Sequence, residues 1–548
     1  MSDPVQTKLV SKQNPKHWRR SVALLCCWPA TLVFAAMPPM SEPQAARLLQ
    51  QGTFGPTLSD IRQASQLDAA GWISAQMALP ASYHRPLLTP VAGPDMLVPL
   101  SRLEVWWQHA LSAPDQLRQR VAFALSEILV VSDQGAGLTD RVDAVTRYYD
   151  LLVEHAFGNY RDLLQAVTLS PVMGTYLSHR GNQKADVSQN IRPDENYARE
   201  LMQLFTLGTC QLTMTAEPVT DQQGHCLSTY QQADIEALAR VFTGWTSAGT
   251  RVFTKPTKDL LSPMIAFPAY HDSEGKQLFG TVELAAGLTP QQDLTQALDA
   301  IFAQPNVAPF ISKQLIQKLV TSNPTPAYIG RVSAVFADNG NGVRGDLAAV
   351  VRAILLDDEA RTGFAGISRP FGKIREPLLK TTHSWRVTRS ANASGHIYLR
   401  NLSDSHGQAP LQSPSVFNFY RPDFSPSQTL QQAGLVAPEL QMLTDSNALA
   451  MQNHLFTQTV QSIAGEVTAP AQYQLLADFA PYGAVIQQQG VQALLDQYSL
   501  LAFAGQMPAD LRQLLTELAT GIRYRSAAQQ AAYLWYFLLN SPQYAVQR

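Results

Sequence analysis

The sequence is poor in charge, and no strong charge of either sign dominates it. Charged residues make up 15% of its 548 residues, well below the ~25% usual in globular domains, and the formal net charge is −2. No block rich in lysine and arginine lies outside the N-terminus. A nearly neutral chain lacks the long-range attraction that draws proteins to phosphates or anionic lipids. We therefore expect no nucleic-acid partner.

Several catalytic signatures are also missing. The sequence has no G-x-S-x-G, no Walker A pattern and no dinucleotide fingerprint in a strand context. These absences argue against an α/β-hydrolase with a nucleophile elbow, a P-loop NTPase and a Rossmann dinucleotide-binding fold. Strand patterns are scarce, whereas apolar residues recur at helical spacing. The chain is longer than the roughly 250–300 residues at which cores stop growing. We predict an all-α fold: a large multi-helical domain or two helical lobes, with short irregular or hairpin insertions at 209–230 and 247–282.

Apolar periodicity predicts helices along most of the chain. They fall at 138–157, 159–179, 194–207, 231–243, 290–303, 307–321, 325–338, 345–357, 373–387, 436–460, 490–503, 508–520 and 526–540. The predicted organisation is a signal peptide at 1–36, a helical domain at 42–388, a long loop at 389–435 and a C-terminal helical region at 436–548.

The first 36 residues have the pattern of an export signal. A basic region ending in Arg19 and Arg20 precedes an apolar run at 22–36 with small residues at its end, as signal-peptidase cleavage requires. The run is shorter than the ~20 residues of a membrane helix and contains Pro29. We expect a periplasmic or secreted protein without a membrane span after cleavage. A short membrane anchor is the alternative, and the arginine pair leaves general secretion or twin-arginine export open.

Two of the four cysteines, Cys26 and Cys27, fall in this leader, so Cys210 and Cys226 remain in the mature chain. In an oxidising compartment this pair predicts a disulfide, whereas two free thiols are the alternative. Such a loop would contribute about 3 kcal/mol by restricting the unfolded chain.

The segment 193–208 contains the most informative motif. Asp194 can cap a helix that Gly208 ends. At 100° per residue one face is buried, and beside it runs a polar stripe of Asn196, Glu200 and Gln203. Glu195 and Arg199, four residues apart, can pair on the far side. A carboxylate in that stripe can serve as a base or ligand, or it can satisfy buried groups and pair with an arginine.

The helix at 231–243 follows Thr229, which has capping-box spacing to Gln232. Asp234 lies in its first turn, where the helix dipole favours a negative charge. A later loop groups His271, Asp272 and Lys276. His271 can bind a metal or shuttle protons with Asp272 orienting it, or it can be a hydrogen-bonded structural residue.

Two further segments carry polar or aromatic groups. The charged segment 372–377 includes Arg375, and Gln408 leads into a stretch with Phe417, Phe419 and Tyr420. Aromatic residues and arginine are favoured at interfaces. This stretch is therefore a substrate-binding wall, a protein contact or a packed lid over the helical core.

In order, these motifs resemble the bacterial domain-of-unknown-function family 1800. The matching segments are 48–57, 195–201, 230–235, 242–245, 271–272, 372–377 and 407–408, and the resemblance spans about 42–546. It implies an exported protein, often encoded beside a second exported protein with a sulfatase-like fold, but no agreed reaction. Asp194 stands where many members have Asn, and residues 418–420 replace a Gly-Trp-Pro segment, which indicates a subgroup.

Two hypotheses follow. In the first, the protein is an extracytoplasmic enzyme, with or without the aid of a divalent metal, that acts on a polymer or surface substrate. The candidate catalytic residues are Glu195, Glu200, Asp234, His271 and Asp272. Glu200 and His271 are the candidate metal ligands, and the candidate binding residues are Asn196, Arg199, Lys276, Arg375 and Gln408. In the second, the protein is a helical scaffold or escort that binds the sulfatase-like neighbour, through an exposed aromatic patch around Phe417.

Overall fold

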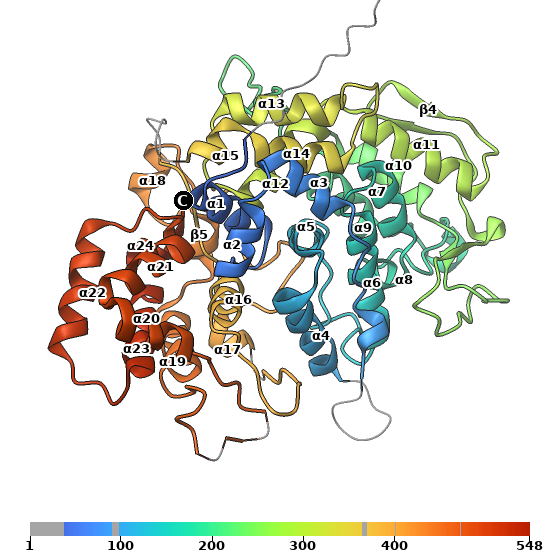
Figure 1. Cartoon of the computed structure of the whole chain (residues 1–548). Coiled ribbons are helices and arrows are strands. Elements are labelled where there is room, and N and C mark those ends of the chain that lie inside the picture. The colour runs from blue at the N-terminus through green and yellow to red at the C-terminus, as the bar shows by residue number, and fades with distance from the viewer. Residues whose placement is uncertain (1–37, 90–97, 364–369, 400–401, 469, 472) are drawn as a thin grey trace, which may run out of the picture. The chain divides into compact units, whose positions relative to one another are not determined.

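Short helices with well-defined ends make up most of the described chain (Figure 1). The computed structural model describes residues 38–89, 98–363, 370–399, 402–468, 470–471 and 473–548, so the predicted signal peptide at 1–36 lies outside the described residues. The helices of the first half are α1 (Glu42–Gly52), α2 (Leu58–Ala64), α3 (Ala69–Met77), α4 (Pro99–Ser112), α5 (Gln116–Ser126), α6 (Val142–His155), α7 (Tyr160–Leu169), α8 (Pro171–Tyr176), α9 (Asn196–Gln203) and α10 (Gln232–Val241).

The second half of the chain also consists mainly of short helices. Its helices are α11 (Pro290–Ala303), α12 (Val307–Leu319), α13 (Pro326–Ala337), α14 (Leu347–Leu356), α15 (Asp358–Thr362), α16 (Pro377–Val387), α17 (Leu402–His406), α18 (Gln428–Gln432), α19 (Asp445–Thr459), α20 (Ala480–Gln489), α21 (Val491–Phe503), α22 (Ala509–Gly521), α23 (Ala527–Leu539) and α24 (Pro542–Ala545). Single turns of 3₁₀ helix are η1 (Arg85–Leu87), η2 (Val187–Gln189), η3 (Pro268–Tyr270) and η4 (Pro438–Gln441).

Many helices begin on a side-chain cap. Ser41 and Gln44 form a reciprocal capping box at α1, and Thr289 and Gln292 do the same at α11. Each box satisfies backbone N–H groups that the first helical turn leaves without a partner. Proline follows at the first helical positions of α11, where its fixed φ suits a helix and its missing N–H costs nothing. These local signals explain why α11 matches the predicted range 290–303.

The strands are short and form three separate pairs among the described residues. Strands β1 (Trp245–Thr246) and β2 (Ile265–Ala266) pair antiparallel, as do β3 (Lys276–Leu278) and β4 (Val282–Leu284). Strands β2 and β3 lie in the predicted insertion at 247–282, whereas β1 lies just before it and β4 begins at its last residue. Strand β5 (Lys373–Ile374) pairs with β6 (Val546–Gln547), with Lys373 opposite Gln547. This third pair ties the end of the chain to its middle.

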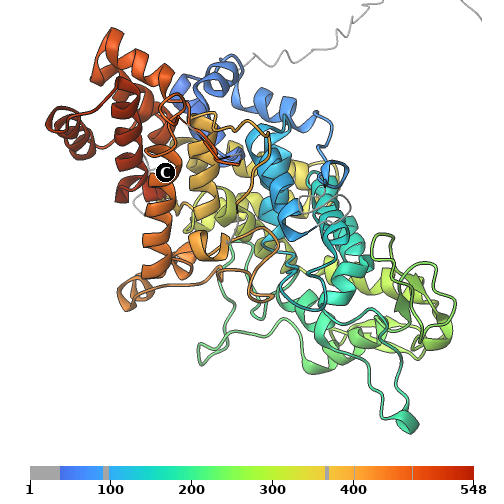
Figure 2. The same ribbon diagram turned by 90° about the horizontal axis from the view of Figure 1, so that it is seen from below.

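One continuous hydrophobic cluster runs from Met40 to Tyr544, and the residues from Pro39 onward form one compact unit. In Figures 1 and 2 the C-terminal helices (red) lie together next to α16 and α17, and the N-terminal helices (blue) lie beside them. Helix α1 packs against α21 and also against α14 and α15. The fold is therefore mostly α-helical, as predicted, and these residues make one multi-helical domain rather than two lobes. No helix in the described part of the chain has the length and apolar character needed to cross a membrane.

Several predicted boundaries were wrong for local reasons. The predicted helix at 159–179 is divided into α7 and α8 at Ser170, because Pro171 starts a new helix. Thr229 does not cap α10. Its hydroxyl donates to the Gly208 carbonyl, while Gln231 and Asp234 form the capping box. The predicted loop at 389–435 contains the short helices α17 and α18, and α20 occupies a stretch for which we predicted no helix.

The disulfide prediction is confirmed. Cys210 and Cys226 form a disulfide, with a Cα–Cα distance of 5.6 Å. The alternative of two free thiols is therefore wrong. Backbone bridges join Cys210 to Ser228 and Thr220 to Cys226. The disulfide thus holds the two arms of a folded-back loop at the end of α9.

Candidate functional site

The motif at 193–208 (the α9 motif) folds only in part as its spacing predicts, because α9 has Glu195 rather than Asp194 as its N-cap residue and ends at Gln203 rather than at Gly208. Arg199 lies 3.0 Å from Glu195, and Glu195 also accepts a hydrogen bond of 3.0 Å from Gln232 on α10. Asn196 is exposed, and its backbone N–H donates to Asp194. These contacts give Glu195 and Arg199 a role in joining two helices.

Glu200 differs from its neighbours because it is buried. Its side-chain Oε2 has no hydrogen-bond partner among the described residues. Burial raises the pKa of Glu200, and the nearby Arg199 opposes that shift. One turn further along α9, Gln203 lines the cavity described below.

Asp234 is used in backbone capping. One carboxylate oxygen accepts the Gln231 N–H at 2.7 Å, and the other accepts the Phe279 N–H at 2.5 Å. Asp234 therefore starts α10 and fixes the turn between β3 and β4.

His271, Asp272 and Lys276 form a second group, centred on α11. The His271 ring nitrogens lie 3.0 Å from the Thr243 carbonyl and 3.1 Å from Asp293, while Lys276 Nζ lies 2.5 Å from the same Asp293 oxygen. Asp272 instead makes two hydrogen bonds, of 2.8 and 2.9 Å, with Arg240. None of these contacts involves Glu200. Within the described part of the chain, no three or more His, Cys, Asp and Glu side chains are grouped so that they could hold a metal ion.

Arg375 lies elsewhere again. It donates to the backbone carbonyls of Tyr544 and Ala502, each at 3.1 Å, and its guanidinium stacks over the Tyr544 ring. It is buried where the N-terminal, middle and C-terminal segments meet. Gln408, by contrast, belongs to a buried network of charges.

That network lies at one end of a cavity of about 360 Å³. The cavity is bounded by the end of α5, the end of α9, one face of α12 and the loop 416–423. Glu127, Lys318, Asn418 and Tyr420 line it and are all buried. The aromatic loop is therefore a cavity wall rather than an exposed patch: Tyr420 is inside, whereas Phe417 remains 46% exposed.

Glu127 is the central group of this site. Its carboxylate lies 3.5 Å from Lys318 Nζ and accepts hydrogen bonds of 3.4 Å from Tyr420 and Asn418. Gln408 donates to it at 3.3 Å. Lys318 also lies 3.9 Å above the centre of the Tyr420 ring, a favourable cation–π position.

Behind Glu127 a second layer of charges is buried. Gln408 donates at 2.7 Å to Glu376 as well, and so links the two carboxylates. Lys373 Nζ lies 2.9 Å from Glu376 and 3.4 Å from Glu439. Removing one member of such a buried set would leave its partner's charge without compensation.

The network separates the pKa values of its carboxyl groups. Burial, together with the negative charge of Glu376, raises the pKa of Glu127 to about 7. Burial acts on Glu376 in the same sense, but Lys373, Arg120 and Lys318 outweigh it and lower the pKa of Glu376 to about 2. Two neighbouring carboxyls with separated pKa values are a common arrangement for acid–base chemistry, and perturbed groups in a cavity mark candidate functional sites.

Sequence reasoning had named Gln408, the segment 372–377 and the aromatic loop, but it missed Glu127, Lys318 and Glu439. A signal was present, because Glu127 is the one charged residue in the apolar run 121–131. A charge in such a run must find a buried partner or a cavity.

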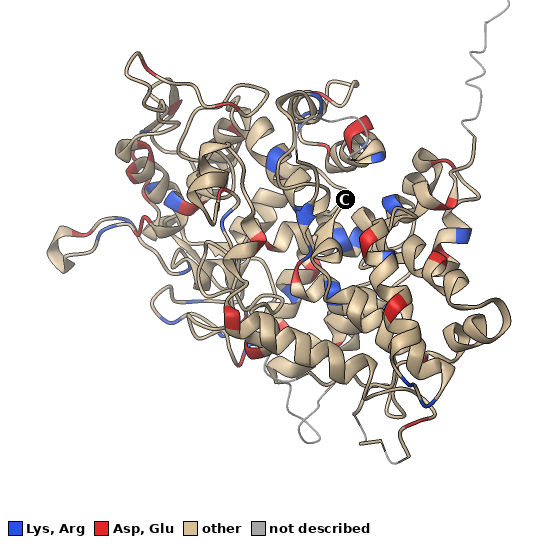
Figure 3. Ribbon diagram, turned by 90° about the vertical axis from the view of Figure 1, so that its left-hand side faces the viewer, with Lys and Arg blue, Asp and Glu red and all other residues tan. Residues whose placement is uncertain are grey.

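The ribbon coloured by charge shows acidic and basic segments interspersed rather than separated by sign (Figure 3).

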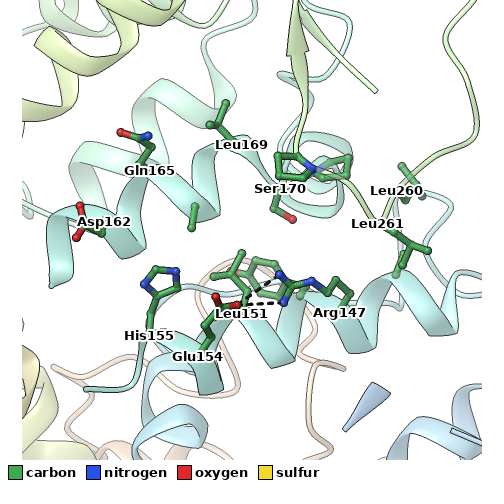
Figure 4. Close-up of a pocket in the computed structure, with 15 residues that line it drawn as sticks. Arg147, Leu151, Glu154, His155, Asp162, Gln165, Leu169, Ser170, Leu260 and Leu261 are labelled. Carbon is green, nitrogen blue, oxygen red and sulfur yellow. Dashed lines mark hydrogen bonds and ion pairs between the residues drawn. The ribbon is translucent and has the colours of Figure 1, made fainter. Parts of the chain in front are cut away.

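Two other cavities have charged groups that already pair with the protein. In a cavity of about 280 Å³ between α6 and α7, Arg147 pairs with Glu154 at 3.4 Å beside His155 (Figure 4). Both partners are more than one-third exposed, so water screens the pair. A cavity of about 710 Å³ contains Arg386, which binds Asp60 and three backbone carbonyls.

Comparison with known proteins gives one match. No curated protein and no solved structure matches the chain. Residues 47–546 match the family described as "Protein of unknown function (DUF1800)". The match covers nearly all of the described domain, including both the α9 motif and the Glu127 cavity, and the chain therefore belongs to this family.

Proposed function

We propose that the protein is an exported enzyme that transfers protons to or from a substrate in the 360 Å³ cavity, with Glu127 as the acid–base residue. The observation that carries this proposal is a buried carboxyl lining a cavity, with a pKa of about 7. At neutral pH such a group is present in both protonation states, so it can accept or donate a proton. Export is supported by the leader pattern at 1–36 and by the Cys210–Cys226 disulfide.

The neighbours of Glu127 suit this role. Lys318 stabilises the ionised carboxylate and lies where it can also stabilise negative charge that develops on a substrate. Tyr420 and Asn418 fix the direction of the carboxylate through hydrogen bonds. Gln408 and Lys373 keep Glu376 ionised behind it, which favours the neutral form of Glu127.

The test compares the purified mature protein with Glu127→Gln. Each is incubated with a polysaccharide and peptide fraction of the bacterial envelope, and low-mass products are followed by mass spectrometry. We expect the rate of product formation to fall about 10²–10⁴-fold in the variant. Glu517→Gln, an exposed substitution on α22, is the matched control and should keep the wild-type rate. Equal rates in all three proteins would refute the proposal.

Export has its own measurement. N-terminal sequencing of the protein from the periplasm or medium should give a mature chain that starts close to residue 37. A full-length chain retained in the cell membrane would instead indicate an anchor.

A second candidate function is favoured by one observation. Phe417 is 46% exposed at the cavity wall, as expected if the protein escorts the exported sulfatase-like neighbour that the family resemblance implies. Co-purification of that untagged neighbour with the wild type, and its loss in Phe417→Ser, would support an escort. A monomer that forms products without a partner would favour the enzyme.

A further inference from the structure

The cavity face of α12 carries two buried amide atoms that lack partners among the described residues. Gln314 is 9% and Gln317 is 4% exposed, and both line the cavity. Gln314 Nε2 and Gln317 Oε1 have no hydrogen bond. An unsatisfied buried polar group costs about 1–3 kcal/mol, so a ligand that pairs with these atoms recovers that energy.

The orientation of Gln317 is fixed by its other contacts. Its Nε2 donates to the carbonyls of Ser322 at 3.0 Å and Pro422 at 3.2 Å. The amide cannot be turned over without losing both bonds, so the atom of Gln317 that lacks a partner is an acceptor. Gln314 offers a donor three residues away on the same helix face. The ligand must therefore supply a donor for Gln317 and an acceptor or a donor for Gln314, and hydroxyl groups can do both.

Lys313 adds a positive charge to the same face. It lines the cavity, is half-buried, and within the described part of the chain has no hydrogen bond or ion pair with a carboxylate. Burial lowers the pKa of Lys313, and the charge of Asp423, which also lines the cavity and pairs with Arg421 at 3.5 Å, opposes that shift. An ammonium group in this position selects a ligand that carries an anion.

Apolar side chains complete the lining. Phe310 and Phe417 face the cavity together with Val416 and Leu204. Aromatic rings of this kind pack against the C–H face of a sugar ring while its hydroxyls reach polar groups. The volume of about 360 Å³ is at the lower end of the ~300–1,000 Å³ typical of ligand sites.

We propose that the cavity binds a carboxylate-bearing sugar residue of a glycan, with its carboxylate on Lys313 and its hydroxyls on Gln314 and Gln317. This inference rests on the proposed function, because it names the substrate class of the same site. It places the sugar between α12 and the aromatic loop, with one end directed toward Glu127.

Calorimetric titration of the full mature protein tests the inference. The probes are trisaccharides that contain glucuronate, galacturonate or muramate, each compared with its neutral counterpart, and a tripeptide with a free carboxylate. We expect at least one acidic trisaccharide to bind at least tenfold more tightly than its neutral counterpart. Lys313→Met should abolish that preference, whereas Lys258→Met, at an exposed lysine, should keep it. Gln314→Leu should weaken both the acidic and the neutral sugar, because it removes a donor but no hydrogen bond of the protein.

The outcomes separate the inference from the proposed function. Tight binding of the tripeptide alone, or no preference for any acidic sugar, overturns the inference even if Glu127→Gln abolishes product formation. Acidic-sugar binding that depends on Lys313 supports it, even if Glu127→Gln leaves product formation unchanged and so refutes the acid–base role. Glu127→Gln itself should bind the acidic sugar within about threefold of wild type.

Discussion

Replacing Glu127 with glutamine removes a carboxyl group that folding makes harder to ionise. Burial and the neighbouring Glu376 raise its pKa from 4.5 to about 7. Between these pH values the native state binds more protons than the unfolded state. The contribution of Glu127 to the free energy of unfolding therefore decreases as the pH rises from about 4.5 to about 7, because the native protein must give up a proton that the unfolded chain has already lost.

The size of this effect follows from the pKa difference. Each pH unit corresponds to about 1.4 kcal/mol, so the rise from 4.5 to about 7 amounts to about 3 kcal/mol. Glu376 acts in the opposite sense and in another range. Its pKa is lowered to about 2, so its contribution is present above about 4.5 and is lost as the pH falls toward 2. Burial lowers the pKa of His109, His179 and His454 to about 4, so these histidines act in the opposite sense to Glu127 over the same pH range. The contribution of Glu127 is therefore the difference between wild type and Glu127→Gln in their change from pH 5 to pH 8.

Urea unfolding followed by tryptophan fluorescence provides the assay. Wild type, Glu127→Gln and the exposed control Glu517→Gln are compared at pH 5 and pH 8. From pH 5 to pH 8, the free energy of unfolding of the wild type and of the control should fall by up to about 3 kcal/mol relative to that of Glu127→Gln. If the free energy of unfolding of Glu127→Gln changed between pH 5 and pH 8 by the same amount as that of the wild type, the assignment of a raised pKa to this residue would be wrong.

Three further predictions concern the groups around the cavity. Lys373→Met leaves Glu376 buried without its closest cation and should lower the free energy of unfolding by about 3–5 kcal/mol in urea titrations, whereas substituting an exposed lysine should change it by less than about 0.5 kcal/mol. Cys210→Ser with Cys226→Ser opens a loop with a sequence separation of 16. The double substitution should lower the free energy of unfolding by about 3 kcal/mol and raise the rate of hydrogen exchange in that loop. An unchanged exchange rate would contradict this prediction. Gly208→Ala puts a side chain at a φ of 69° and 2.6 Å from a ring in the cavity wall. It should lower stability by more than about 1–2 kcal/mol, and a wild-type melting temperature would count against that reasoning.

Much of the fold was predictable because its signals are local. Capping residues and prolines mark the ends of helices such as α11, and periodic apolar residues mark their buried faces. The Glu195–Arg199 pair and the disulfide also depend on spacing or on a small set of candidates. The break at Pro171 was missed because apolar periodicity continues through it, and α17 and α18 were missed because each is a single short turn of helix within a polar segment.

The candidate site was harder to predict because its members come from distant segments. The four residues come from separate segments: Glu127 directly follows α5, Lys318 is on α12, Gln408 follows α17 and Glu439 is in η4. Tertiary packing alone brings them together. Sequence reasoning favoured Glu200 and His271 because their titratable neighbours are adjacent in the sequence. In the structure, however, the neighbours of His271 are Thr243 and Asp293. Asp272, next to His271 in the loop, instead pairs with Arg240. The single charged residue in the apolar run 121–131 was the signal of a buried site, and it was missed.

The most direct test of the acid–base role needs no substrate. Difference infrared spectroscopy of wild type minus Glu127→Gln isolates the carboxyl bands of this residue, and a pH titration of those bands gives its pKa. We predict a midpoint of about 7. A midpoint near 4.5, the ordinary value for glutamate, would contradict the proposal that Glu127 exchanges protons with a substrate at neutral pH.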